Sequence, residues 1–324
     1  MKPILVNTDY DDVLAGGKPQ ASRILALEFL AFWLVKNPVR VHRQYPAEYL
    51  DYIQQHTGHR PDLRQQGSGE NWWGPLKEIE FERRLNSKVG SFQWWQPRWN
   101  LAGKVCHNSD DVKELLSSGG EWILKRAQGM SGRGNRVLRS LEDLTKIPAD
   151  WFEYGAVVEP LRDRVSDLSA LWLPAEDKFI FYRNEIDDKF QWRAVVLENG
   201  GAPTFSAEEL SAMGEWQKKL AELAATMRAN DYHGPFSVDA FFYHEGGVLK
   251  FHPCSEINAR KTMGWIAYQF FLRNSPSQAR LSLLPKKLTP EQWTKECNSL
   301  AGANLILSPP DAPFMWCWKE TTSR

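Results

Sequence analysis

Residues 255–260 read Ser-Glu-Ile-Asn-Ala-Arg, and this stretch decides the fold more than any other part of the chain. Side chains two apart on a strand point to the same face, so Glu256 and Asn258 project together if the stretch is extended. A carboxylate beside an amide oxygen suits Mg²⁺, a hard ion that prefers oxygen ligands and keeps some of its waters. The stretch therefore predicts part of a metal site.

A second carboxylate comes from the preceding strand, where Asp239 faces the returning strand of a predicted hairpin. A tight turn at Gly246 would place Asp239 near His252 rather than Glu256. A bulge at Pro253 or a wider turn is needed to bring the two acids together. The alternative is a pair of solvent-facing polar residues on an edge strand. The apolar residues that flank both acids favour a buried sheet, and hence the metal site.

A glycine-rich loop follows the strand that ends at Lys125. It reads Gln128-Gly129-Met130-Ser131-Gly132-Arg133-Gly134. No acid occurs between Lys125 and Arg139, although the protein as a whole has zero formal net charge. Glycines let backbone N–H groups close on phosphate oxygens, and a lysine at the strand end adds a positive charge. A solvated basic turn is the equally weighted alternative. The spacing excludes a P-loop and a dinucleotide-binding fingerprint.

The remaining pattern predicts an α/β lobe followed by an α+β region of antiparallel hairpins. The first lobe begins with a strand near Ile4 to Val6, a buried helix from Ala21 to Val35 and a second strand at Val39 to Val41, which is a βαβ beginning. Farther along the chain, the segment from Ala207 to Ala229 has the spacing of one long amphipathic helix. We expect a hairpin formed by Asp167 to Leu173 and Phe179 to Arg183.

The composition excludes several classes of protein. Lys plus Arg and Asp plus Glu each number 40, so no global field attracts nucleic acid or anionic lipid. Four scattered Cys without a CxxC pair favour reduced thiols in a cytosol. Acids close to the N-terminus argue against a signal peptide, and no apolar run reaches the roughly 20 residues that span a bilayer. We expect a cytoplasmic protein. The chain has 15 Trp, for which packing is favoured over a binding role.

Taken together, these segments resemble the ATP-grasp superfamily over roughly residues 88–264. That resemblance implies an N-terminal α/β domain (1–86), a small ATP-grasp lobe with a glycine-rich flap (87–160), and a large lobe with a C-terminal tail (161–324). It implies ATP and Mg²⁺ or Mn²⁺ as cofactors. The metal ligands would be Asp239, Glu256 and Asn258. The ATP-binding residues would be Lys88, Lys125, Gln128, Gly129, Ser131, Gly132, Arg133, Gly134, Glu159, Leu161 and Asp167, with Glu159 and Leu161 on the hinge strand and Asp167 at the ribose.

One position departs from the family pattern. Many ATP-grasp ligases carry an Arg just before the first metal Asp, where this chain has Ser237. The charge that steadies the transferred phosphate must then come from another residue. Arg260 is the first candidate for this catalytic role and Arg193 is the second.

The resemblance implies an ATP-dependent carboxylate–amine ligase that joins amino acids or short peptides through an acyl phosphate and releases ADP and phosphate. An ATP-grasp phosphotransferase and a nucleotide-binding module without turnover are the alternatives. The expected partners are small-molecule carboxylates and amines, with neither nucleic acid nor membrane. The sequence leaves the substrates and the oligomeric state open.

Overall fold

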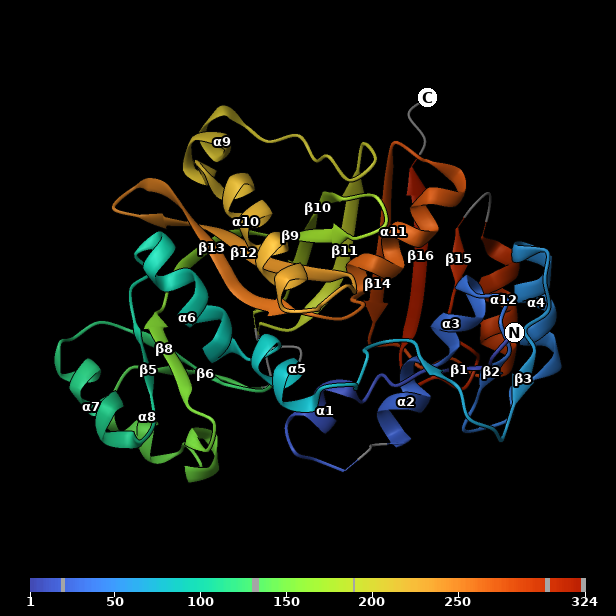
Figure 1. The fold of residues 1–324 in the computed structure, drawn as a ribbon. Coiled ribbons are helices and arrows are strands. Elements are labelled where there is room, and N and C mark those ends of the chain that lie inside the picture. The colour runs from blue at the N-terminus through green and yellow to red at the C-terminus, as the bar shows by residue number, and fades with distance from the viewer. Residues whose placement is uncertain (19–20, 130–133, 189, 301–303, 322–324) are drawn as a thin grey trace.

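The computed structural model describes residues 1–324 except 19–20, 130–133, 189, 301–303 and 322–324. Within the described residues, two four-stranded sheets and one eight-stranded sheet form the framework (Figure 1). The parallel sheet lies near the N-terminus, the small antiparallel sheet at the opposite end, and the large sheet between them. No helix in the described part of the chain is long and apolar enough to cross a membrane.

The N-terminal sheet has the strand order β3-β2-β1-β4, and all of its pairings are parallel. Its strands are β1 (Ile4–Leu5), β2 (Val39–Arg40), β3 (Leu63–Arg64) and β4 (Glu70–Asn71). Helices α1 (Tyr10–Leu14), α2 (Ala21–Leu27), α3 (Phe29–Leu34) and α4 (Ala47–Thr57) connect β1, β2 and β3. The chain moves to one side of β1 for β2 and β3, and then returns to its other side as β4. The strand order therefore reverses between β1 and β4.

The helix predicted from Ala21 to Val35 is two helices, α2 and α3, which meet at Glu28. Glu28 is fully buried, and its carboxylate accepts hydrogen bonds from the Tyr45 hydroxyl at 2.7 Å and the His42 backbone N–H at 3.2 Å. A buried carboxylate needs such partners, and the segment after β2 supplies them. The apolar periodicity identified the helical segment but could not show this break.

The small sheet has the order β5-β8-β6-β7 and is antiparallel. Its strands are β5 (Lys104–Cys106), β6 (Trp122–Arg126), β7 (Asn135–Leu138) and β8 (Ala156–Pro160). Helices α7 (Ser109–Ser117) and α8 (Leu141–Thr145) and the 3-10 turn η1 (Ala149–Phe152) pack on it around a core of its own that includes Leu124, Leu138 and Val158. The predicted cap of α8 is present, since the Ser140 side chain accepts a hydrogen bond from the Asp143 N–H.

The large sheet has the order β13-β12-β9-β10-β11-β14-β16-β15, and every pairing in it is antiparallel. Its strands are β9 (Asp163–Leu173), β10 (Lys178–Ile186), β11 (Trp192–Glu198), β12 (Phe236–Glu245), β13 (Val248–Asn258), β14 (Gln278–Leu284), β15 (Leu305–Ile306) and β16 (Met315–Thr321). Its helices are α9 (Ala207–Met213), α10 (Trp216–Ala229), α11 (Met263–Asn274) and α12 (Pro290–Ser299). The single helix predicted from Ala207 to Ala229 is thus two, because Gly214 ends α9 with a positive φ of 49°.

Helices α5 (Ile79–Leu85) and α6 (Lys88–Trp99) connect the N-terminal lobe to the small sheet. Helix α6 lies between the two antiparallel sheets and packs against β13 and β8 (Figure 1). Ser87 caps its first turn by accepting hydrogen bonds from the N–H groups of Val89 and Gly90. Its first residue, Lys88, contacts both sheets, because its backbone N–H donates to the carbonyl of Ala127, just after β6, and its ammonium group pairs with Glu256 of β13.

Candidate functional site

Strands β12 and β13 place the predicted metal ligands side by side. Asp239 pairs with Glu256 and Ser237 pairs with Asn258, whereas Phe241 pairs with His252. Two steps along β12 therefore correspond to four steps along β13. The extra residues of β13 include Pro253, where the sequence required a bulge. This irregularity brings the two carboxylates opposite each other.

Hydrogen bonds fix the Asp239 carboxylate on both of its oxygens. Asn258 Nδ2 donates to Oδ2 at 2.9 Å, and Ser169 Oγ donates to Oδ1 at 2.6 Å. Ser169 is fully buried on β9 and accepts a hydrogen bond from Asn184 Nδ2 at 2.7 Å. The neighbouring strands therefore hold the acid in one orientation.

Burial and the nearby charge of Glu256 raise the pKa of Asp239 from 3.8 to about 6, against the lowering effect of the Ser169 hydrogen bond. Burial disfavours the charged form of a carboxyl group, and a like charge adds to that effect. A cation between the two acids would remove the repulsion. The sequence-predicted cluster of Asp239, Glu256 and Asn258 thus has the donor chemistry that a divalent cation requires.

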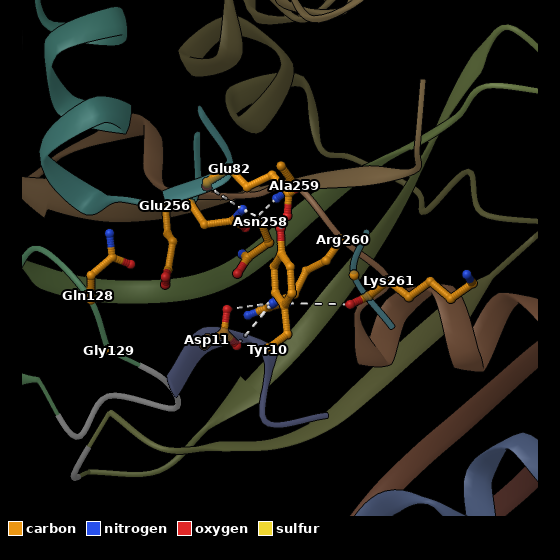
Figure 2. Close-up of polar contacts among 12 residues, drawn as sticks. Tyr10, Asp11, Glu82, Gln128, Gly129, Glu256, Asn258, Ala259, Arg260 and Lys261 are labelled. Carbon is orange, nitrogen blue, oxygen red and sulfur yellow. Dashed lines mark hydrogen bonds and ion pairs between the residues drawn. The ribbon is translucent and has the colours of Figure 1, made fainter. Parts of the chain in front are cut away.

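Lys88 connects this cluster to the glycine-rich loop. Its ammonium group lies 2.8 Å from Glu256 Oε1 and donates to the Gly129 carbonyl oxygen at 3.0 Å. The Lys88 backbone N–H also donates to the Ala127 carbonyl at 2.9 Å. The Lys88 side chain is only 7% exposed. Glu256 and Gly129 lie on the same side of the site as Gln128 (Figure 2).

A second buried lysine lies on the small sheet. Lys125 forms an ion pair with Glu159 of β8, and the other oxygen of Glu159 lies 3.1 Å from His252 Nε2. Burial acts to raise the pKa of Glu159, but the charges of Lys125 and His252 outweigh it and lower that pKa to about 2. Burial lowers the pKa of His252. The sequence predicted Lys125 and Glu159 for the site, but His252 was not included.

Arg164 is a further cation that the sequence did not predict. Its guanidinium lies 4.2 Å from the centroid of the Phe241 ring, and it forms an ion pair with Asp167, the predicted ribose-binding acid. Burial lowers the pKa of Arg164 to about 10, although Asp239 and Glu159 act to raise it. The charge of Arg164 therefore interacts with Asp239 on the large sheet and with Glu159 on the small sheet. Its position three residues before Asp167 on β9 was the available signal.

The two predicted catalytic arginines differ in position. Arg260 Nε donates to both oxygens of Asp11, at 2.8 and 3.0 Å, directly beyond the end of β13 (Figure 2). The neighbouring acids, Asp11 first and then Glu256, raise the pKa of Arg260 against the opposing effect of burial. Arg193 instead lies on β11, which is separated from β12 by β9 and β10, and its guanidinium pairs with Asp187, the residue after β10. The structure therefore does not bring Arg193 to the cluster.

Three other predicted residues, Gln128, Leu161 and Gly134, form hydrogen bonds with backbone groups of neighbouring segments. Gln128 Nε2 donates to the Arg83 carbonyl at 3.0 Å, and the Leu161 N–H donates to the Glu121 carbonyl at 2.8 Å. The Gly134 carbonyl accepts from the Arg126 N–H at 2.8 Å, which closes the described base of the loop. The predicted residues Ser131, Gly132 and Arg133 lie outside the described residues.

Two side chains that sequence reasoning missed attach the start of α6 to the end of β13. Asn86 Oδ1 accepts from the Ala259 N–H at 2.7 Å, and Ser91 Oγ accepts from the Ile257 N–H at 2.9 Å. Both are buried, so each bond satisfies a backbone donor that has no access to water. They fix Lys88 relative to Glu256.

The residues present fit a nucleotide with a divalent cation. Lys88 and Lys125 are buried positive charges of the kind that pairs with phosphate oxygens, and the acid pair offers oxygen atoms of the kind that binds Mg²⁺. The described residues hold no group of three or more His, Cys, Asp or Glu that could bind a metal ion on its own. Two carboxylates and an amide leave positions for waters and phosphate oxygens, which is how Mg²⁺ is commonly held.

Neither a protein-family model nor a curated protein matches the chain. Solved structures do match it over almost its full length. N5-carboxyaminoimidazole synthetase from Staphylococcus aureus, complexed with ADP, has a TM-score of 0.56 at 11% identity, with 99% of this chain and 93% of that chain covered. N5-carboxyaminoimidazole ribonucleotide synthetase from Thermus thermophilus has a TM-score of 0.51 at 18% identity, with 100% and 94% covered.

A third similar structure is the biotin carboxylase domain of 2-oxoglutarate carboxylase from Hydrogenobacter thermophilus, in complex with MgADP, ADP and bicarbonate. It has a TM-score of 0.54 at 11% identity, with 99% of this chain and 86% of that chain covered. At these identities the likeness establishes the fold. The chain has the ATP-grasp fold that the resemblance over residues 88–264 predicted.

Proposed function

We propose that the protein is an ATP-dependent carboxylate–amine ligase. The observation that carries this proposal is a chain of buried charges around β12 and β13. Lys88 pairs with Glu256, which faces Asp239, and Lys125 pairs with Glu159, whose other oxygen contacts His252 of β13. The similar structures support it, because two of them are named as complexes with ADP or MgADP.

Each group has a proposed role. Asp239, Glu256 and Asn258 would hold Mg²⁺ or Mn²⁺, and Lys88 and Lys125 would neutralise phosphate oxygens. ATP supplies the phosphoryl group that activates a carboxylate toward an amine. Arg260 would stabilise the charge on that phosphoryl group, since this chain has Ser237 where many ATP-grasp ligases carry an arginine. Arg260 follows the end of β13 by two residues, and its charge interacts with that of Glu256. Arg164 is a second candidate for that charge.

The substrates would be amino acids or short peptides, and the division into 1–86, 87–160 and 161–324 would separate a substrate domain from the two nucleotide-binding lobes. A cytoplasmic location remains a prediction from cysteine usage.

Calorimetric titration with ATP and Mg²⁺ tests the nucleotide site. Lys125→Ala should weaken ATP binding by about tenfold to a hundredfold, because a charged hydrogen bond to phosphate contributes about 1.5–3 kcal/mol. Lys113→Ala is the matched control, since Lys113 is an exposed small-lobe lysine that pairs with Asp110. Unchanged affinity in Lys125→Ala would contradict the placement.

A coupled assay of ADP release then tests the reaction. ADP release that requires both a carboxylate and an amine is expected of a ligase. ADP release that needs only one substrate would support the phosphotransferase alternative. Nucleotide binding without any ADP release over the panel would support a module without turnover.

A further inference from the structure

His252 of β13 links the large sheet to a buried ion pair of the small sheet. Its imidazole stacks on the ring of Phe241, its partner on β12, with 4.6 Å between the ring centroids and an angle of 9° between the ring planes. Its Nε2 lies 3.1 Å from one oxygen of Glu159, and the other oxygen of Glu159 pairs with Lys125. All four side chains are buried. One carboxylate therefore faces two groups that can carry a positive charge.

These contacts determine the protonation of the imidazole. Glu159 is ionised because its pKa is about 2, so Nε2 of His252 carries the hydrogen that is donated to it. Nδ1 has no hydrogen-bond partner among the described residues. Burial lowers the pKa of His252, and the charges of Lys125 and Arg164 lower it further, against the opposing effect of Glu159. Near pH 7 the imidazole is therefore neutral, and Lys125 supplies the charge that balances Glu159.

The other charged groups near the imidazole largely balance one another. His252 lines a cavity of about 750 Å³, and the charged residues that line it besides Glu159 are two acids and two bases, Glu208, Glu245, Arg162 and Lys250. Arg162 and Glu245 form an ion pair. On β9, the guanidinium of Arg164 pairs with Asp167. The cavity offers water a route toward the imidazole, which the exchange of a proton with solvent requires.

Nucleotide binding would disturb this balance, because under the proposed function Lys125 turns toward a phosphate oxygen. We propose that His252 is a positioning residue that takes up a proton when nucleotide binds and replaces Lys125 as the positive partner of Glu159. The proton comes from solvent and enters at Nδ1, while the hydrogen bond from Nε2 to Glu159 is kept. Glu159 then stays ionised and in place on β8. The proposal rests on the proposed function, to which it adds a proton that is bound together with the nucleotide.

Three physical effects favour this exchange. A buried carboxylate that loses its cation is strongly destabilised, so a replacement cation is favoured. The negative charge of the phosphates also favours the charged form of a nearby imidazole. The face of the Phe241 ring, on which the imidazole already stacks, attracts a cation. If nucleotide favours the protonated form of His252, protonation must favour nucleotide binding to the same extent, so the affinity should fall as the pH rises.

Calorimetry measures this proton directly. A non-hydrolysable ATP analogue with Mg²⁺ is titrated into the protein at pH 7 in PIPES and in Tris, which differ in their enthalpy of ionisation, and the difference in heat gives the number of protons taken up. His252→Gln is the test variant, because its amide can still donate to Glu159 but cannot take up a proton. The wild type should take up about half to one proton more per bound nucleotide than this variant.

The matched control is His244→Gln, since His244 is an exposed histidine on the same hairpin. It should take up as many protons as the wild type. Protons exchanged by Asp239 or by the analogue itself are common to the three proteins and cancel in the comparison. From pH 6.5 to pH 8, the affinity of the wild type should fall relative to that of His252→Gln by up to about tenfold per pH unit.

A second measurement needs no nucleotide. In Lys125→Ala, His252 is left as the cationic partner of Glu159, so its imidazole should titrate at a higher pH than in the wild type. The imidazole C2–H signal in the NMR spectrum reports this titration, and the loss of one signal in His252→Gln assigns it.

Equal proton uptake by the wild type and His252→Gln would overturn the proposal, and so would a His252 titration that is unchanged in Lys125→Ala. The calorimetric comparison does not depend on the stability of Lys125→Ala. Failure of the analogue to bind the wild type would contradict the proposed function instead. The NMR titration would then still decide whether Lys125 controls the protonation of His252.

Discussion

The charge of Asp239 lowers the free energy of unfolding of the protein, and a single substitution should remove this penalty. The pKa of Asp239 is raised from 3.8 to about 6 by burial and by the charge of Glu256. The folded protein therefore keeps a proton on this group to a higher pH than the unfolded chain does. The resulting penalty is absent below about pH 4, develops between about pH 4 and 6, and is complete above that range.

The size of the penalty follows from the shift. Each pKa unit corresponds to about 1.4 kcal/mol, so this shift corresponds to roughly 3 kcal/mol at pH 7.5. Asp239→Asn keeps the shape and loses the charge. The new amide can still bond to Ser169, and a flip of the Asn258 amide would restore the second hydrogen bond. We therefore expect Asp239→Asn to be more stable than the wild type by about 1–3 kcal/mol at pH 7.5.

Urea unfolding of both proteins at pH 4 and pH 7.5 measures the effect. The stabilisation should be present at pH 7.5 and nearly absent at pH 4. Asp163→Asn serves as a control, because Asp163 is an exposed acid at the start of the neighbouring strand. A variant that is less stable than the wild type at pH 7.5, or a difference that does not change with pH, would refute the electrostatic reasoning. Added Mg²⁺ should stabilise the wild type more than the variant.

The other predictions concern the remaining charges of the site. Glu256→Gln should keep the fold but lower ADP release about a hundredfold across a Mg²⁺ titration, and normal turnover at every Mg²⁺ level would remove the metal assignment. Glu159→Gln should destabilise the protein by about 3 kcal/mol at pH 7, because it leaves the buried Lys125 unpaired. The pKa of Glu159 is about 2, so its stabilisation is present above about pH 4.5 and lost as the pH falls toward 2; urea unfolding should show a smaller deficit for the variant at pH 3 than at pH 7.

The part of the site on β12 and β13 could be predicted from sequence because it depends on local rules. Alternation along a strand places Glu256 and Asn258 on one face. The turn at Gly246 and the proline at 253 indicated that the hairpin needs an irregularity to bring Asp239 opposite Glu256. The structure has this irregularity as extra residues on β13. The basic, glycine-rich loop after Lys125 is also a local pattern.

The unpredicted parts depend on contacts between residues far apart in the chain. Nothing near Asn86 or Ser91 indicates that their side chains bond to the backbone of residues 257–259. Arg164 is an ordinary strand residue until β12 places Phe241 under its guanidinium. The break at Glu28 depends on Tyr45 and His42, which no periodicity in the helix can reveal.

The lysines of the site form ion pairs with its acids. An exchange of these partners would allow the same residues to bind both a metal ion and a phosphate. Lys88 is held by Glu256, and Lys125 is held by Glu159. Asp239 has hydrogen bonds but also the repulsion of Glu256, which adds to burial in raising its pKa. A divalent cation between Asp239 and Glu256 would compete with Lys88 for Glu256 and leave the ammonium group for a phosphate oxygen. Metal and nucleotide would therefore each favour the binding of the other through the exchange of partners at Glu256.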